Sequence, residues 1–178
     1  MKKNETLKRY FKKYTDEVIK NFDLSKINQI IKKLENFNKQ LLIFGNGGTS
    51  AIANHMANDF MNVTKIKTLS FSDSSLITCY SNDYGYENWV CKTIDNYSEK
   101  GDIVILMSSS GMSPNMIKAA KKCKKEKIFF ITLSGFDKKN KLSKFGNIRI
   151  HVDSKSYNYV ELSHLQILMA VVDNLKKN

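Results

Sequence analysis

Five short segments rich in apolar residues divide the chain into regular intervals. Leu41-Leu42-Ile43-Phe44 and Ile103–Met107 are continuous apolar runs, which is typical of strands buried on both faces of a parallel sheet. Each of these two runs ends at a glycine-rich or serine-rich loop. We therefore predict strands at 41–44, 66–71, 103–107, 128–133 and 147–152.

Longer segments with helical spacing separate these strands. Ile27, Ile30, Ile31 and Leu34 fall on one face of the segment 25–37. Polar residues at 82–86 indicate a loop, and Pro114 suits the first turn of a helix. The predicted helices cover 4–22, 25–37, 49–61, 87–97, 114–125 and 157–176. Strands that alternate with helices predict an α/β fold: a three-layer αβα sandwich with a five-stranded, mostly parallel sheet and extra N-terminal helices.

The length of 178 residues and the apolar content of 42% suit one globular domain. No apolar stretch approaches the roughly 18 residues of a spanning helix, and the N-terminal segment lacks the apolar core of a secretory signal. The three cysteines, Cys79, Cys91 and Cys123, match no paired metal spacing. We expect a cytoplasmic protein with reduced thiols.

The net charge of +12 comes almost entirely from lysine, since Arg9 and Arg149 are the only arginines. Recognition of base edges favours arginine, whose planar guanidinium bonds bidentately. The lysines concentrate in the N-terminal helices and between Lys118 and Lys144, where we interpret them as solvated helix faces. We therefore expect no nucleic-acid or membrane partner, although the positive field would favour a phosphorylated small molecule.

The loop Ser108-Ser109-Ser110-Gly111-Met112-Ser113 follows the clearest predicted strand and precedes a helix. In an open parallel sheet, ligands bind beyond the carboxyl ends of the strands. Four hydroxyls and the free amides of a helix N-terminus suit an anion there. Ordinary helix capping is the alternative, and it would explain one serine rather than four. This loop predicts a phosphate site.

A second loop, Gly45-Asn46-Gly47-Gly48-Thr49, follows the first predicted strand. Its glycines allow the backbone to approach a ligand closely. It lacks the spacing of a dinucleotide fingerprint or a P-loop, so no nucleotide cofactor is expected.

Together the ordered motifs resemble the sugar isomerase (SIS) domain family, and within it the phosphoheptose isomerases. The likeness runs from about residue 4 to the C-terminus and implies a single SIS domain over 1–178, with N-terminal helices at 1–38 and an α/β core at 39–178. The motifs that carry it are the two loops, His55, Asn82-Asp83-Tyr84-Gly85-Tyr86, Pro114-Asn115, Ile131-Thr132-Leu133-Ser134-Gly135 and Glu161-Leu162-Ser163-His164.

The resemblance implies a role for individual residues. The phosphate would be held by Ser108, Ser109, Ser110 and Ser113. The sugar would be contacted by Asn46, Gly47, Thr49, Asp83, Asn158 and Glu161. The family is usually a homotetramer with active sites at subunit interfaces, and it often holds zinc through side chains that include a histidine and a glutamate four residues apart.

The sequence departs from the family pattern at the positions of the metal ligands and the catalytic acid and base. His55 is present, but Asp59 replaces the glutamate, Glu161 replaces a glutamine, and Met169 stands where the family has its last histidine. A zinc site on His55, Asp59 and Glu161 is predicted, since histidine with carboxylates suits zinc. Asp59 is the predicted general base, although a metal-bound Asp59 could not act freely as one.

The general acid is the least defined part of the predicted site. His164 is the nearest substitute for the missing histidine, but it lies about −60° around a helix from Glu161, whereas Met169 lies about +80°. Water or a neighbouring subunit could supply the proton instead, and a structural role for His164 is the alternative.

Three functions stay open from the sequence. The leading hypothesis is isomerisation of sedoheptulose 7-phosphate to D-glycero-D-manno-heptose 7-phosphate. The resemblance implies that this heptose is made for surface polysaccharide. The others are a non-catalytic SIS module that binds a sugar phosphate or a protein, which Met169 favours, and an isomerase for a different phosphosugar.

Overall fold

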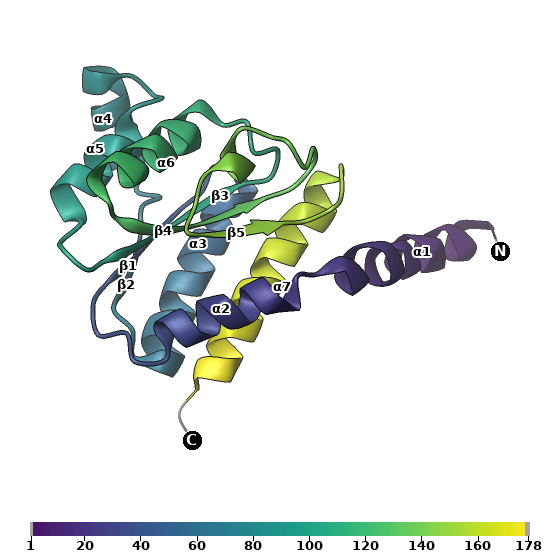
Figure 1. Cartoon of the computed structure of the whole chain (residues 1–178). Helices are drawn as coiled ribbons and strands as arrows, with labels where there is room; N and C mark the ends of the chain where they lie inside the picture. The colour runs from purple at the N-terminus through teal and green to yellow at the C-terminus, as the bar shows by residue number, and fades with distance from the viewer. Residues whose placement is uncertain (1, 177–178) are drawn as a thin grey trace.

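The computed structural model describes residues 2–176 and shows a five-stranded parallel sheet between two layers of helices (Figure 1). The strands are β1 (Leu41–Phe44), β2 (Thr68–Ser70), β3 (Ile103–Ser108), β4 (Phe129–Ser134) and β5 (Ile148–His151), in the spatial order β2-β1-β3-β4-β5. The predicted fold class and all five strands are confirmed. The strand predicted at 66–71 is shorter than expected.

The helices enclose both faces of the sheet. One layer contains α2 (Leu24–Leu34), α3 (Gly48–Asp59) and α7 (Tyr157–Leu175), and the other contains α5 (Trp89–Tyr97) and α6 (Pro114–Glu126) (Figure 1). Side chains alternate along each strand, so Ile43 and Ile105 face the first layer whereas Phe44 and Leu106 face the second. The two apolar cores explain why the central strands have no polar face.

The N-terminal helix α1 (Lys2–Lys13) projects away from the body of the molecule (Figure 1). It continues through the short helical turns η1 (Tyr14–Val18) and η2 (Ile19–Asn21), in agreement with a helix predicted over 4–22. Tyr14 and Tyr159 join this segment to α7, with ring centroids 5.4 Å apart. Leu7 and Phe11 are 54% and 64% exposed, so these two apolar side chains of α1 are largely open to solvent.

One predicted loop is helical in the structure. Residues 82–84 form the last turn of α4 (Ser74–Tyr84), which begins after the side-chain cap of Asp73. The helix ends at Gly85, whose φ of +84° is a conformation that favours glycine. The prediction was wrong because it weighed the polar residues Asn82 and Asp83 above the glycine stop signal.

The remaining connections are short. A π-turn η3 (Phe60–Thr64) extends α3, and a 3-10 turn η4 (Leu142–Lys144) lies between β4 and β5. No helix among residues 2–176 is long and apolar enough to cross a membrane.

Candidate functional site

The two predicted ligand loops meet at the centre of the sheet. The glycine loop follows β1 and the serine loop follows β3, and these strands are neighbours with Phe44 paired to Leu106. From β1 the chain crosses to β2 on one side, while β3 leads to β4 on the other. Ligands of open α/β sheets bind at such a reversal of strand order. The topology therefore places both loops at one site, which the sequence could not establish.

The N-terminus of α6 is not capped by a serine, because its Met116 amide donates to Oδ1 of Asn115 at 3.0 Å. Ser113 is the N-cap residue but makes no capping hydrogen bond, and Pro114 occupies the first helical position. The hydroxyl of Ser113 instead lies 2.9 Å from that of Ser108, across the turn. The first amides of a helix have no partner within the helix. Helix capping by Ser113 therefore does not account for this loop. Pro114 has no amide hydrogen and the Ile117 amide donates to the Ser113 carbonyl, so the amide of Asn115 is the helical donor that an anion could use.

Gly111 allows the serine loop to turn tightly. Its φ is +66°, and a Cβ at this position would lie 2.0 Å from the Asn140 side chain. The amide of Leu142 donates to the Gly111 carbonyl at 3.0 Å, which attaches η4 to the loop.

The four serines differ in their surroundings. Ser108 and Ser109 are buried, at 3% and 6% exposed, and the Ser109 hydroxyl donates to Oε1 of Glu161 at 3.2 Å. The Ser110 hydroxyl accepts from the Met112 amide at 3.3 Å, which leaves its own hydrogen free for a ligand.

Glu161 lies between the two loops, in the first turns of α7. Its Oε2 occupies the space beside Gly48, where an added Cβ would lie only 2.1 Å away. A side chain at that position would displace the carboxylate, so glycine leaves room for Glu161 there. Glu161 thus lies close to both the serine loop and the start of α3, in agreement with its predicted place in the site.

A pair of amides joins the two loops. Asn46 Nδ2 donates to Asn115 Oδ1 at 3.0 Å, and Asn115 Nδ2 donates to Asn46 Oδ1 at 2.9 Å. The hydroxyl of Tyr86 also donates to Asn46 Oδ1, at 3.3 Å. Asn115 is completely buried in α6, whereas Tyr86 is 54% exposed. Sequence reasoning assigned no chemistry to Asn115 or Tyr86. An asparagine directly after the helix-starting proline was the available signal, but its burial follows only from the fold.

Thr49 has a different role from the predicted one. Its hydroxyl donates to the Asn46 carbonyl and accepts from the Asn46 amide, both at 2.8 Å. The side chain is 2% exposed and its single hydrogen is already used. Thr49 therefore holds the glycine loop in shape, and its contact with a sugar stays a prediction.

Asp83 and Asn158 are not joined to the loops by hydrogen bonds. Asp83 is exposed at the end of α4, where it accepts from Asn82 Nδ2 at 3.0 Å. Asn158 is exposed in the first turn of α7. Their contact with a sugar stays a prediction.

His55 and Asp59 form a pair on α3, with His55 Nε2 lying 3.1 Å from Asp59 Oδ2. They share a helix face with Gly48, but they lie about 10 and 16 Å further along the helix axis. No hydrogen bond or ion pair among the described residues joins this pair to the serine loop.

The predicted zinc site is not formed by one chain. Among residues 2–176 no group of three or more His, Cys, Asp and Glu side chains lies close enough to hold a metal ion. The Glu161 carboxylate, from α7, lies beside Gly48 at the start of α3, whereas His55 lies two helical turns further along α3. The donor set of a single chain does not fit zinc.

His164 cannot serve as the general acid. Its side chain is completely buried, and neither ring nitrogen has a hydrogen-bond partner among the described residues. Burial lowers the pKa of His164 to about 4, so the ring is neutral near pH 7. A side chain without access to solvent cannot exchange protons with a substrate. The predicted catalytic role of His164 was wrong, and the structural alternative applies.

Met169 lies on the outer face of α7 and is 39% exposed. With Tyr14, Leu162, Leu165 and Gln166 it lines a hollow of about 470 Å³ whose surface is mostly apolar. The hollow lies between η1, which contributes Tyr14, and α7, which contributes the other lining residues. No histidine lines it.

Comparison with known proteins defines the class of this fold and site. Residues 5–135 match the SIS domain model, and the chain therefore belongs to the SIS domain family. Within the family it resembles the phosphoheptose isomerases. It is 30% identical to the phosphoheptose isomerase of Fusobacterium nucleatum over 171 residues, which cover 93% of this chain and 88% of the relative.

Two further comparisons agree with this assignment. Phosphoheptose isomerase 2 of Campylobacter jejuni is 40% identical over 124 residues, 66% of this chain and 59% of the relative. The structure of phosphoheptose isomerase from Neisseria gonorrhoeae superimposes with a TM-score of 0.86 at 22% identity, over 99% of this chain and 100% of that one. At this identity the structural likeness shows the shared fold.

Proposed function

We propose that this protein is an aldose–ketose isomerase of a sugar phosphate, with sedoheptulose 7-phosphate as substrate and D-glycero-D-manno-heptose 7-phosphate as product. The observation that carries the proposal is the loop with four serines at the start of α6, at the reversal of strand order. The similarity to phosphoheptose isomerases over 93% of the chain supports the choice of substrate.

The serine loop would bind the phosphate through the free hydrogen of Ser110 and the amide of Asn115 at the start of α6. The fixed amide pair of Asn46 and Asn115 would hold the two loops at a constant separation. Such positioning lowers the entropic part of the barrier, because the reacting carbons are held in place by remote binding.

The reaction moves a proton between C1 and C2 through an enediol, which requires a base beside the carbon. We assign this role to Asp59, which is partly exposed and paired with His55. Because His164 is sealed in the core, the proton for the neighbouring oxygen comes from water or from another subunit.

The separation of His55 and Asp59 from the serine loop supports a homo-oligomer. A phosphosugar bound at one chain's loop would meet this pair on a second chain. The exposed apolar residues of α1 and the hollow around Met169 provide surface for that contact. The homotetramer predicted from the family fits this arrangement. A metal ion on His55 and Asp59 would need a further ligand from another chain, so no step is assigned to zinc.

The decisive experiment is NMR of the protein with sedoheptulose 7-phosphate in deuterated water, with and without zinc. Exchange of the hydrogen next to the carbonyl, or formation of the aldose, is expected. Ser110→Ala should weaken binding of the sugar phosphate severalfold, because a phosphate oxygen loses a donor. Ser25→Ala, an exposed serine on α2, is the matched control and should change nothing.

A non-catalytic module is the second candidate, and Met169 is the observation that favours it. Binding of the sugar phosphate without hydrogen exchange, in the presence and absence of zinc, would exclude the isomerase and support the module. Absence of binding to the serine loop would exclude both.

A further inference from the structure

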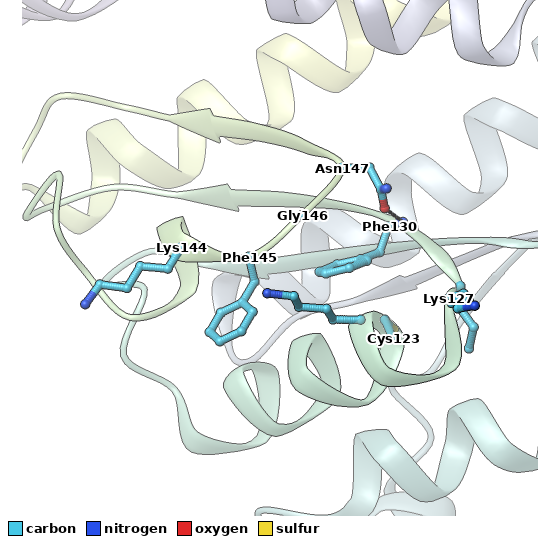
Figure 2. A pocket seen from close by; sticks show the side chains of 9 residues that line it. Cys123, Lys127, Phe130, Lys144, Phe145, Gly146 and Asn147 are labelled. Carbon is cyan, nitrogen blue, oxygen red and sulfur yellow. Dashed lines mark hydrogen bonds between the residues drawn. The ribbon is translucent and has the colours of Figure 1, made fainter.

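A groove lies between α6 and η4, on the helical layer opposite α2, α3 and α7. Two adjoining hollows of about 350 Å³ each form it, and both are lined by Lys144 and Phe145. Figure 2 shows one of them: Lys144 and Phe145 come from the end of η4, and Cys123 and Lys127 from the last turns of α6. We call the two hollows together the lysine groove.

Six lysines line the lysine groove, and no acidic residue does. They are Lys118, Lys121, Lys124, Lys127, Lys141 and Lys144. Lys118 pairs with Glu87 outside the groove. The other five make no ion pair with any part of the chain that the structure describes, residues 2–176. The positive charge of the groove is therefore not neutralised within the protein.

The distribution of charge along the chain agrees with this concentration. Ten lysines and two acidic residues lie between Lys118 and Lys144, so this segment carries a net charge of +8 out of +12 for the chain. From the sequence these lysines appeared as separate solvated faces. The fold instead turns the lysines of α6 and those before β5 toward the same groove.

The lysine groove is distinct from the sugar-phosphate site. It begins at Met112, at the end of the serine loop, and at Pro114, and it extends along α6 to Gly146 and Asn147. The thirteen residues of α6 span about 20 Å, so the groove is longer than a single phosphate group requires. A linear ligand with several negative charges fits its length and charge.

The composition of the walls indicates which polyanion fits. Lysine ammonium groups neutralise phosphates as point charges, and the absence of arginine from the walls argues against recognition of base edges. Phe145 is half-buried between the two hollows, with Lys124 Nζ 5.9 Å from its ring centroid. An aromatic ring beside cations is the usual platform on which bases of single strands stack.

We propose that the lysine groove binds single-stranded nucleic acid through its phosphate backbone, without sequence preference. A ring that can stack with a base favours a nucleic acid over an acidic peptide. The same ring favours a single strand over a duplex, because the bases of a duplex are already stacked on one another. The proposal does not depend on the isomerase activity, because none of the six lysines of the groove belongs to the sugar-phosphate site.

The test measures binding of a fluorescent 20-nucleotide oligo(dT) to the full chain by anisotropy, over a series of salt concentrations. The groove variant carries Lys121→Gln, Lys124→Gln and Lys144→Gln. The control variant carries Lys8→Gln, Lys12→Gln and Lys32→Gln, which remove the same charge from exposed positions on α1 and α2. Thermal melting of both variants verifies that they are folded.

We expect the groove variant to bind at least tenfold more weakly at low salt, and the control to bind like the parent protein. Each phosphate contact contributes about 0.7 to the slope of log K against log salt for single strands, so three lost contacts should lower the slope by about 2. Phe145→Leu should weaken binding severalfold with the slope unchanged, because stacking is lost and charge is not.

Three results would overturn the proposal. Equal weakening in the two triple variants would show that net charge alone attracts the strand. No binding of oligo(dT) by the parent protein at low salt would exclude the site. A poly-glutamate peptide that binds as tightly as oligo(dT), with the same loss in the groove variant, would assign the groove to an acidic protein partner instead.

Discussion

The carboxylate of Glu161 should oppose binding of phosphate at the serine loop. The Ser109 hydroxyl donates its only hydrogen to Glu161 Oε1, so a phosphate oxygen would have to compete for it. Replacement by Gln keeps the length of the side chain, and its packing against Gly48, while it removes the negative charge. We therefore predict that Glu161→Gln tightens binding of a sugar phosphate or of inorganic phosphate in the absence of divalent ions.

The magnitude follows from the geometry around Ser109. The carboxylate oxygen lies 3.2 Å from the Ser109 hydroxyl. A phosphate oxygen in hydrogen-bond contact with the same hydroxyl would therefore be roughly 6 Å from the carboxylate. Two unit charges at that distance repel by about 1–3 kcal/mol for effective dielectric constants between water and a protein surface. The variant should bind about 5- to 150-fold more tightly.

Isothermal calorimetry in the presence of EDTA measures this change directly. Glu35→Gln is the matched control, since Glu35 is an exposed carboxylate at the end of α2. Its affinity for phosphate should equal that of the parent protein. Weaker binding by Glu161→Gln would refute the reasoning, and it would show that the carboxylate accepts hydrogen bonds from the ligand's own hydroxyls.

Three further predictions concern residues around the site and in the core. Asn115→Ala should destabilise the fold by about 1–3 kcal/mol in urea unfolding, because it leaves the buried side of Asn46 without its partner; a double-mutant cycle with Asn46→Ala that shows no coupling would contradict this. Burial lowers the pKa of His164 to about 4, against about 6.5 in the unfolded chain. Below pH 6.5 the unfolded chain takes up a proton that the folded protein does not, so the free energy of unfolding decreases between pH 6.5 and 4. The parent protein should lose about 2 kcal/mol between pH 7 and 5 from this group, and His164→Leu should lose less; equal losses would exclude His164 as the cause. Met169→His should raise turnover of sedoheptulose 7-phosphate measured by NMR if the missing acid limits the reaction, and unchanged turnover would show that it does not.

The sequence by itself determined the class of fold. Continuous apolar runs such as Ile103–Met107 can only be buried on both faces, and helical spacing between them requires covering helices, so the αβα sandwich followed from local patterns. The anion site at the serine loop is likewise a prediction from local pattern, because a serine-rich turn between a strand and a helix offers hydroxyls and amides wherever the strand lies. The prediction from local pattern was wrong where two signals competed: the polar residues at Asn82 indicated a loop, whereas Gly85 marked the end of a helix that includes residues 82–84.

Tertiary structure alone decided which side chains work together. The neighbouring positions of β1 and β3 bring Asn46 to Asn115 across 69 residues, and α7 places Glu161 between the loops. The same packing directs the Thr49 hydroxyl to the Asn46 carbonyl and buries His164 completely. It also leaves His55 and Glu161 outside any common group of metal-binding side chains among residues 2–176. These outcomes depend on the order of strands and on the rotation of each helix about its axis. Periodicity along a sequence shows which residues of one element share a face, but the neighbours of that face are set by contacts between distant segments.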